Sequence, residues 1–164
     1  MEIALNDDKF IVKYVKGKYS GDDTIKKVIK YIFDDKEIRK KRKQMNIVGA
    51  IGTSTNDIED IISDFKRIKK IYNKTDKKQV VHIILSFNNN PQIDSYNKYR
   101  KLIVKTASFW GNTTQVAYAL HEDTKKRHIH FALNTIKYNG KRLDTYNKWD
   151  EFIDYCHKVW DEYL

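Results

Sequence analysis

The sequence predicts an α+β domain built on a central antiparallel sheet of about five strands, with helices packed on one face. Short runs of β-prone residues alternate along the chain with longer segments whose apolar residues have helical spacing. Two pairs of the predicted strands are separated by only a few polar residues, so each pair should form an antiparallel hairpin. A chain of 164 residues, 40% of them hydrophobic, suits one domain with one core, predicted over residues 1–164.

Six segments have the composition of strands and four have the spacing of helices, in the order ββαβαβαββα. The strands are predicted at residues 2–5, 10–15, 46–51, 79–87, 115–121 and 128–136. Polar turns separate them, such as the tight turn at residues 138–141 that follows the last strand. Small side chains at Ala117 and Ala119 should leave room on one face of the sheet for a ligand strand.

The helices are identified by their apolar stripes and by the residues that cap or end them. Asp22 or Asp23 can cap the first helix, and a polar residue among 54–56 can cap the second, whose charged face is assigned no chemistry. The third helix runs from residue 93 to about 109, before Gly111. The last helix has a stripe typical of core packing, formed by Trp149, Phe152, Ile153, Cys156, Val159 and Trp160.

Charge and cysteine content indicate the setting in which the protein works. The formal net charge of +10 favours a polyanionic partner, although membrane binding or solubility can also explain a basic protein. The single cysteine, Cys156, excludes an intramolecular disulfide, fits a reducing compartment and is expected to be a buried structural thiol. No signal peptide or membrane-spanning segment is visible, so we predict a cytoplasmic protein without membrane insertion.

The chemistry-bearing stretch lies between residues 121 and 134, where three of the five histidines of the chain fall within ten residues. Strand alternation places His128 and His130 on one face and Ile129 on the other. If the strands on either side of the polar loop pair, His121 comes close to His128. Three imidazoles are a ligand set for a divalent ion that keeps open positions for a substrate. A merely polar sheet face is the alternative.

This stretch resembles the third motif of MobP-type relaxases, the MobA/VirD-like mobilisation proteins of the HUH endonuclease superfamily. The residues that carry the resemblance are His121-x-Asp123-Thr124, followed by His128-x-His130, Asn134 and the run Asn134-Thr-Ile-Lys-Tyr-Asn-Gly-Lys-Arg. Relaxases nick one DNA strand at a transfer origin. The resemblance covers nearly the whole chain, and it implies the HUH fold and a metal site formed by His121, His128 and His130.

Two upstream segments resemble the other motifs of the same family. Asp-Thr-Ile-Lys-Lys-Val-Ile-Lys-Tyr31-Ile is similar to the first motif, which carries the nucleophilic tyrosine on an early helix. Tyr31 lies at the edge of the apolar stripe of this helix, and Tyr14 and Tyr19 are its competitors. Val-His82-Ile-Ile-Leu-Ser86-Phe is similar to the second motif, which implies that Ser86 touches the DNA. His82 fits a half-buried strand histidine equally well.

The resemblance implies a transesterification through a tyrosine, whose hydroxyl is a poor nucleophile at neutral pH because its pKa is about 10. A divalent ion would assist, with Mn²⁺ preferred and Mg²⁺ possible, since imidazole ligands suit the softer ions better. Asp123 would either orient a ligand imidazole or help to deprotonate the tyrosine. The DNA contacts expected are Ser86, Asn134 and the basic run Arg39, Lys40, Lys41, Arg42 and Lys43. Support of the hairpin is the alternative role of Asn134.

The expected partners are single-stranded and supercoiled origin DNA, together with relaxosome accessory proteins and a coupling protein. A rolling-circle replication initiator with the same chemistry and a catalytically silent DNA-binding module are the alternative functions. The chain stops soon after its last predicted helix, so we expect either a minimal relaxase or the excised domain of a longer one.

Overall fold

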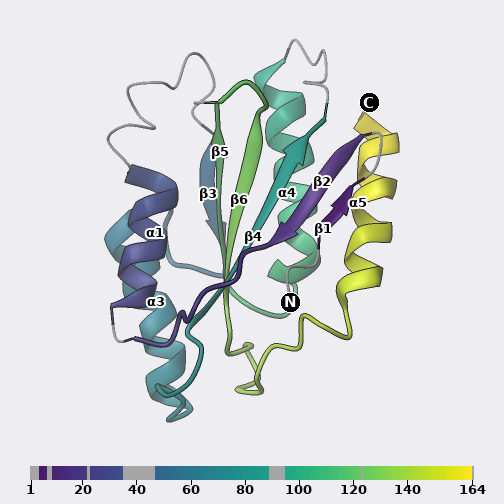
Figure 1. The fold of residues 1–164 in the computed structure, drawn as a ribbon. Coiled ribbons are helices and arrows are strands. Elements are labelled where there is room, and N and C mark those ends of the chain that lie inside the picture. The colour runs from purple at the N-terminus through teal and green to yellow at the C-terminus, as the bar shows by residue number, and fades with distance from the viewer. Residues whose placement is uncertain are drawn as a thin grey trace.

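The structure, a computed structural model, describes residues 4–6, 9–21, 23–34, 47–88, 95–122 and 124–163. Its strands are β1 (Ala4–Asn6), β2 (Phe10–Tyr14), β3 (Val48–Ile51), β4 (Val80–Phe87), β5 (Val116–His121) and β6 (His128–Asn134). Its helices are α1 (Thr24–Asp34), α3 (Ile58–Ile71), α4 (Tyr96–Gly111) and α5 (Trp149–Tyr163). These elements pack together in layers (Figure 1).

The strands form one sheet in the order β1-β2-β4-β6-β5-β3, and every neighbouring pair is antiparallel. The predicted α+β class and the antiparallel sheet are therefore confirmed. The described sheet has six strands, and β4 and β6 lie at its centre. The loop between β5 and β6 closes the hairpin that carries the three clustered histidines.

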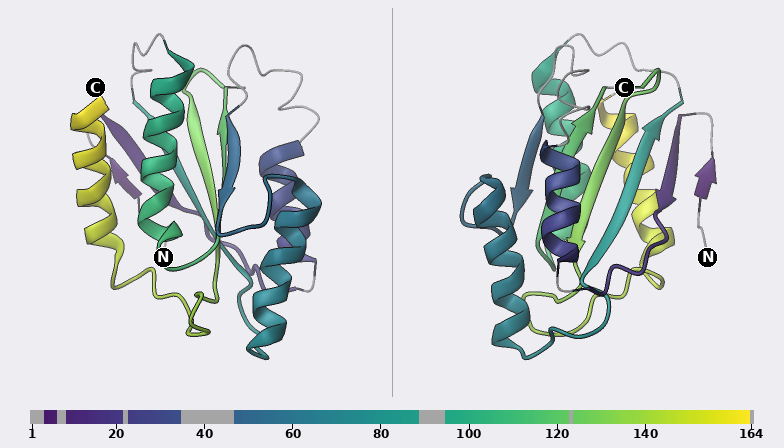
Figure 2. Two further views of the ribbon diagram at one scale, coloured as in Figure 1. Left: turned by 180° about the vertical axis from the view of Figure 1, so that it is seen from behind. Right: turned by 60° about the vertical axis from the view of Figure 1, so that its left-hand side comes forward.

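Helices cover both faces of the sheet, and the expectation that they pack on one face is wrong. On one side α4 and α5 bury a large apolar cluster that includes Phe131 and Trp160. On the other side α1 and α3 bury a second cluster that includes the alanines of β5 and β6. Both views of Figure 2 show these two helices on that side of the sheet. The reason is steric, because Ala117 and Ala119 let a helix approach the sheet closely. The space predicted for a ligand strand is occupied here by helix.

Helix α1 is the element that positions the site. Its stripe, formed by Ile25, Val28, Ile29, Ile32 and Phe33, is buried against the sheet and against α3. Because α1 contacts β4, β5 and β6, it spans the three strands that carry the chemistry-bearing residues. Tyr31 lies beside this stripe and is 46% exposed, as the predicted stripe-edge position requires.

The capping of α3 differs from the sequence-based expectation. The N-cap of α3 is Asp57, whose carboxylate accepts a hydrogen bond from the Glu59 amide over 3.0 Å, and not one of residues 54–56. Ser54 instead donates two hydrogen bonds to Asp64, through its amide and its hydroxyl, and these bonds lower the pKa of that carboxyl. None of the described helices is both long enough and apolar enough to cross a lipid bilayer.

Candidate metal centre and active site

The strand register brings the three histidines of the β5–β6 hairpin together. His121 is directly opposite His128, and His130 is opposite Ala119 on the same face of the sheet. One ring nitrogen from each of His121, His128 and His130 lies within 4.8 Å of the others. The closest pair of rings, His121 and His130, has centroids 4.0 Å apart. His121 and His130 are buried and His128 is half-buried, so the cluster opens to solvent on one side.

Backbone carbonyls fix the orientation of two of these imidazoles. His121 donates from Nε2 to the carbonyl of Ile32 over 2.8 Å, and His128 donates from Nδ1 to the carbonyl of Lys126 over 3.1 Å. A carbonyl oxygen can only accept, so the bonded nitrogen carries the proton. In the neutral ring the other nitrogen then has its lone pair available for a ligand bond. Hydrogen bonds of this kind typically orient metal-binding histidines.

The third imidazole, His130, is oriented by a fourth histidine. Nδ1 of His130 lies 2.7 Å from Nε2 of His82, and Nδ1 of His82 lies 3.3 Å from the hydroxyl of Tyr19. Nε2 of His130 is buried and has no hydrogen-bond partner within the described part of the chain. A buried nitrogen without a partner is costly, and an ion bound there would satisfy it. The donor set therefore fits a divalent metal ion.

The electrostatic environment keeps the buried imidazoles of His82 and His130 neutral. Burial, together with the neighbouring His121, lowers the pKa of His82 to about 4. Burial and the surrounding histidines His121, His82 and His128 hold the pKa of His130 still further below its usual value. Only the neutral form of imidazole can bind a metal, so the site does not need to release protons from these two rings at neutral pH.

Tyr31 lies against this histidine cluster from the α1 side. Its ring centroid is 5.7 Å from that of His130 and 6.3 Å from those of His82 and His121, with edge-to-face geometry in each case. Because Tyr31 is also 46% exposed, a molecule that approaches the open side of the cluster can reach it. The structure thus brings together a tyrosine and an imidazole cluster that lie about ninety residues apart in the sequence.

The two competing tyrosines have different surroundings. The hydroxyl of Tyr14 accepts a hydrogen bond from Lys78 Nζ over 2.8 Å, and its ring packs against Trp149. Tyr19 contacts His82 and none of the three clustered histidines. Burial, followed by the effect of Tyr31, raises the pKa of its hydroxyl. Of the three tyrosines, Tyr31 is the one whose ring lies beside two of the metal-binding candidates.

The remaining predicted site residues lie in different surroundings, or outside the described residues. Ser86 is half-buried and pairs with His128 across the sheet, which places it on the histidine face. Asn134 is fully buried, and its amide donates to the Phe65 carbonyl and to Gln115 Oε1, so it has no surface for a DNA contact. Asp123 and the basic run at residues 39–43 lie outside the described residues.

The sequence left His82 open between a residue of the second motif and an ordinary half-buried strand histidine, and it did not identify the Ile32 carbonyl. His82 does share its face of β4 with Ser86, which is the one local signal that it could belong to the site. The partner of Ile32, however, lies 89 residues away, and a backbone carbonyl has no side-chain signature. The first contact depends on β4 pairing with β6, and the second depends on α1 packing against β5.

Comparison with known proteins agrees with this geometry. A protein-family model described as "Relaxase: MobA/VirD2-like, nuclease domain" matches residues 31–163, from Tyr31 to the end of α5. A search of individually curated proteins gave no match. The matched segment covers most of the chain and includes the three clustered histidines. The chain therefore belongs to the MobA/VirD2-like relaxases and contains their nuclease domain.

Proposed function

We propose that this domain nicks one strand of origin DNA by transesterification to Tyr31, with the help of a divalent ion held by His121, His128 and His130. Membership of the relaxase nuclease family supports DNA nicking in general. The observation that carries the specific assignment is the contact of the Tyr31 ring with two of these histidines, at centroid distances of 5.7 and 6.3 Å. This arrangement supports the proposal because the hydroxyl of Tyr31 would lie beside the position where an ion meets a phosphate.

In the proposed reaction the hydroxyl oxygen of Tyr31 attacks the scissile phosphorus. The new bond joins the tyrosine oxygen to the 5′-phosphate, and the bond from phosphorus to the 3′-oxygen breaks. The tyrosine loses its proton and the leaving oxygen gains one, so the products are a 5′-phosphotyrosyl adduct and a free 3′-hydroxyl. The reaction replaces one phosphate ester bond by another without hydrolysis. The 3′-hydroxyl can therefore attack the adduct, reverse the reaction and reseal the strand.

The three ligand histidines would hold the ion, and the ion would polarise the scissile phosphate and offset the charge that develops in the transition state. Imidazole nitrogens favour Mn²⁺ over Mg²⁺ in such a site, so Mn²⁺ is the preferred ion and Mg²⁺ the second choice. The ring hydrogen bonds give the ligands their direction: Ile32 orients His121, Lys126 orients His128, and His82 orients His130.

His82 acts in this proposal as a positioning residue. When Nε2 of His130 faces the ion, its Nδ1 carries the proton and donates to Nε2 of His82. Nδ1 of His82 then carries the proton of that ring and faces the Tyr19 hydroxyl. The low pKa of His82, a result of burial, favours the neutral acceptor form that this chain of hydrogen bonds requires.

DNA would cross the open side of the histidine cluster. Ser86 lies on this face beside His128, and we propose that its hydroxyl contacts the strand near the nick. Asp123 is proposed to help deprotonate the tyrosine or to orient a metal-binding imidazole. The basic run at residues 39–43 is proposed to bind backbone phosphates. Relaxosome accessory proteins and a coupling protein are the further partners that such a role would require.

The test is direct capture of the covalent product. The protein is incubated with supercoiled origin DNA and Mn²⁺, denatured, and analysed for protein attached to a 5′ end. We expect a nicked circle that carries a peptide-linked 5′-phosphate, with the adduct mapped to Tyr31 by mass spectrometry. The assignment is wrong if the linked peptide contains Tyr14 or Tyr19. The nuclease proposal itself fails if neither Mn²⁺ nor Mg²⁺ yields any adduct with the correct origin.

A further inference from the structure

A second polar site lies at the far end of the α1–α3 layer, where three lysines share one face of α3. Lys66, Lys69 and Lys70 are spaced i, i+3 and i+4, which places their side chains beside one another. Together with Ile25, Thr75 and Gln79 they line a cavity of about 240 Å³. Like charges at this spacing repel each other, so the cluster is unfavourable unless an anion compensates it.

Lys69 is the unusual member of this group, because it is only 2% exposed. Its ammonium donates to the Thr135 hydroxyl over 2.8 Å, and that hydroxyl donates in turn to the carbonyl of Lys78 over 2.7 Å. Among the described residues no carboxylate forms an ion pair with Lys69. Burial, and to a smaller extent the charge of Arg142, lower its pKa to about 7. A buried lysine without a counter-ion is costly to keep, as this shift reflects.

A structural role explains only part of this arrangement. Basic residues in the last turn of a helix are favoured by the helix dipole, and Lys70 is exposed there as that effect allows. The dipole does not require Lys69 to be buried, nor Lys66, one turn earlier, to face the same cavity. No acidic side chain is among the residues that line the cavity, so its lining is net positive.

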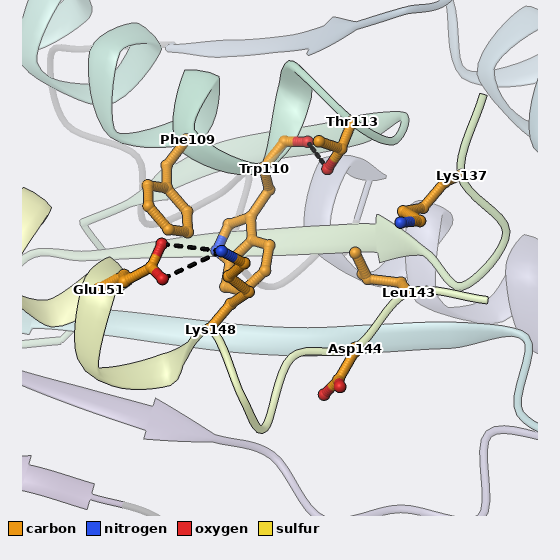
Figure 3. Close-up of a pocket in the computed structure, with 8 residues that line it drawn as sticks. All are labelled: Phe109, Trp110, Thr113, Lys137, Leu143, Asp144, Lys148 and Glu151. Carbon is orange, nitrogen blue, oxygen red and sulfur yellow. Dashed lines mark hydrogen bonds and ion pairs between the residues drawn. The ribbon is translucent and has the colours of Figure 1, made fainter. Parts of the chain in front are cut away.

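In another cavity of the protein, acidic side chains lie near the lysines. On the opposite side of the sheet, a cavity of about 260 Å³ is lined by residues of α4 and α5 and of the segment before α5 (Figure 3). There Lys148 is paired with Glu151 at 3.0 and 3.1 Å, and Asp144 lies near Lys137. Acidic side chains offset the lysines of that cavity, so it has no comparable demand for an anion.

We propose that the cavity lined by Lys66, Lys69 and Lys70 binds a phosphate group, and that this phosphate belongs to the DNA strand held at the histidine cluster. The assignment of this phosphate to the DNA strand rests on the proposed nicking function. Ile25 lines the cavity and Tyr31 reaches the cluster from the same helix, about 9 Å further along its axis. Gln79 of the cavity lies three residues before His82. A phosphate bound here would belong to a nucleotide only a few positions from the scissile bond.

The first experiment uses inorganic phosphate as the probe, without DNA or divalent ion. The ε-carbon resonance of Lys69, assigned by its loss in Lys69→Met, is followed against pH in the full chain with and without phosphate. We expect phosphate to bind saturably and to raise the pKa of this amine, because the anion stabilises the ammonium form. A titration of Lys69 that does not change with phosphate into the millimolar range would overturn the site.

The second experiment asks whether the phosphate is part of DNA. The double variant Lys66→Met/Lys70→Met removes two side chains that are not fully buried, and so it should fold. We expect it to lose the phosphate response of Lys69, to bind a single-stranded oligonucleotide about tenfold more weakly, and to show a salt slope reduced by about one. Lys158 is exposed on α5, across the sheet from the cavity. The control variant Lys158→Met should retain the affinity and salt slope of the wild type.

The outcomes separate this inference from the nuclease proposal. Phosphate binding needs neither a nick nor a metal, so it can be observed in a protein that forms no DNA adduct. Phosphate binding combined with an unchanged oligonucleotide affinity and salt slope in the double variant would assign the cavity to free phosphate and overturn the DNA-strand assignment. Competition between oligonucleotide and phosphate at Lys69 would support the DNA-strand assignment.

Discussion

The Nε2 nitrogen of His121 lies 2.8 Å from the backbone carbonyl oxygen of Ile32, the residue that follows Tyr31. This hydrogen bond joins the helix that carries the candidate nucleophile to a candidate metal ligand. It also fixes the tautomer of His121, since the carbonyl can only accept. Any movement of α1 relative to β5 would therefore disturb the nucleophile and the ligand set together.

The assignment of Tyr31 is tested by Tyr31→Phe. This change removes one oxygen and keeps the ring, so the edge-to-face packing against His121 and His130 should survive, as should Mn²⁺ and DNA affinity. Covalent capture of DNA should disappear, because phenylalanine has no nucleophilic oxygen. Tyr14→Phe is the matched control and should form the adduct at nearly the wild-type level in the same gel assay, as should Tyr19→Phe. Continued capture by Tyr31→Phe would refute the assignment.

The ligand set is tested by calorimetric titration of Mn²⁺ into His128→Ala and His130→Ala. We expect affinity to fall by about one to several orders of magnitude in each, because each loses one of three imidazole nitrogens. The half-buried position of His128 makes its variant the safer one for folding. His157→Ala, on α5 at the opposite face, should bind Mn²⁺ like the wild type. Equal affinity in all three variants would show that the metal binds elsewhere.

The positioning role of His82 makes a graded prediction. His82→Ala leaves Nδ1 of His130 without its acceptor, so Mn²⁺ affinity should drop by about 10- to 100-fold while the three ligands remain. His82→Gln offers an amide oxygen near the position of Nε2 and should recover much of this loss. A residue that served only to pack the sheet would give equal Mn²⁺ affinity in the two variants at equal thermal stability.

The buried Lys69 predicts a specific pH dependence of stability. Its pKa is about 7 in the folded protein and about 10.5 when exposed, so between these values the unfolded chain binds the proton that the folded chain has released. The free energy of unfolding should therefore rise with pH over this window, relative to Lys69→Met, by up to about 1.4 kcal/mol per pH unit. Urea denaturation of both proteins in phosphate-free buffer from pH 7 to 10.5 measures the difference. A difference that is independent of pH would contradict the lowered pKa.

The basic run at residues 39–43 predicts a salt effect on DNA binding. Replacing Arg39, Lys40, Lys41, Arg42 and Lys43 with neutral residues should flatten the dependence of single-stranded DNA affinity on salt, because fewer counterions are released. Fluorescence anisotropy with a labelled oligonucleotide at several salt concentrations gives the slope. If the slope equals that of the wild type, these residues form a solvated segment that makes no phosphate contact.

Several parts of the site could be predicted from the sequence, because they depend on local periodicity. Alternation along β6 is enough to place His128 and His130 on one face, and the hairpin places His121 opposite His128. The stripe of α1 puts Tyr31 at its edge, where the structure has it 46% exposed. The relaxase resemblance, which rests on these short motifs, is confirmed by the family match over residues 31–163.

The tertiary structure alone decided which elements meet these residues. No local pattern shows that α1 and α3 cover the histidine face, because that choice depends on how closely helices can approach Ala117, Ala119 and Ala132. The same packing brings the Ile32 carbonyl to His121, and the strand order sets β4 beside β6, so that His82 reaches His130. It also buries Lys69, on a helix face whose sequence resembles an ordinary solvated surface. Burial depends on what packs over a side chain, and the neighbouring residues in the sequence do not determine it.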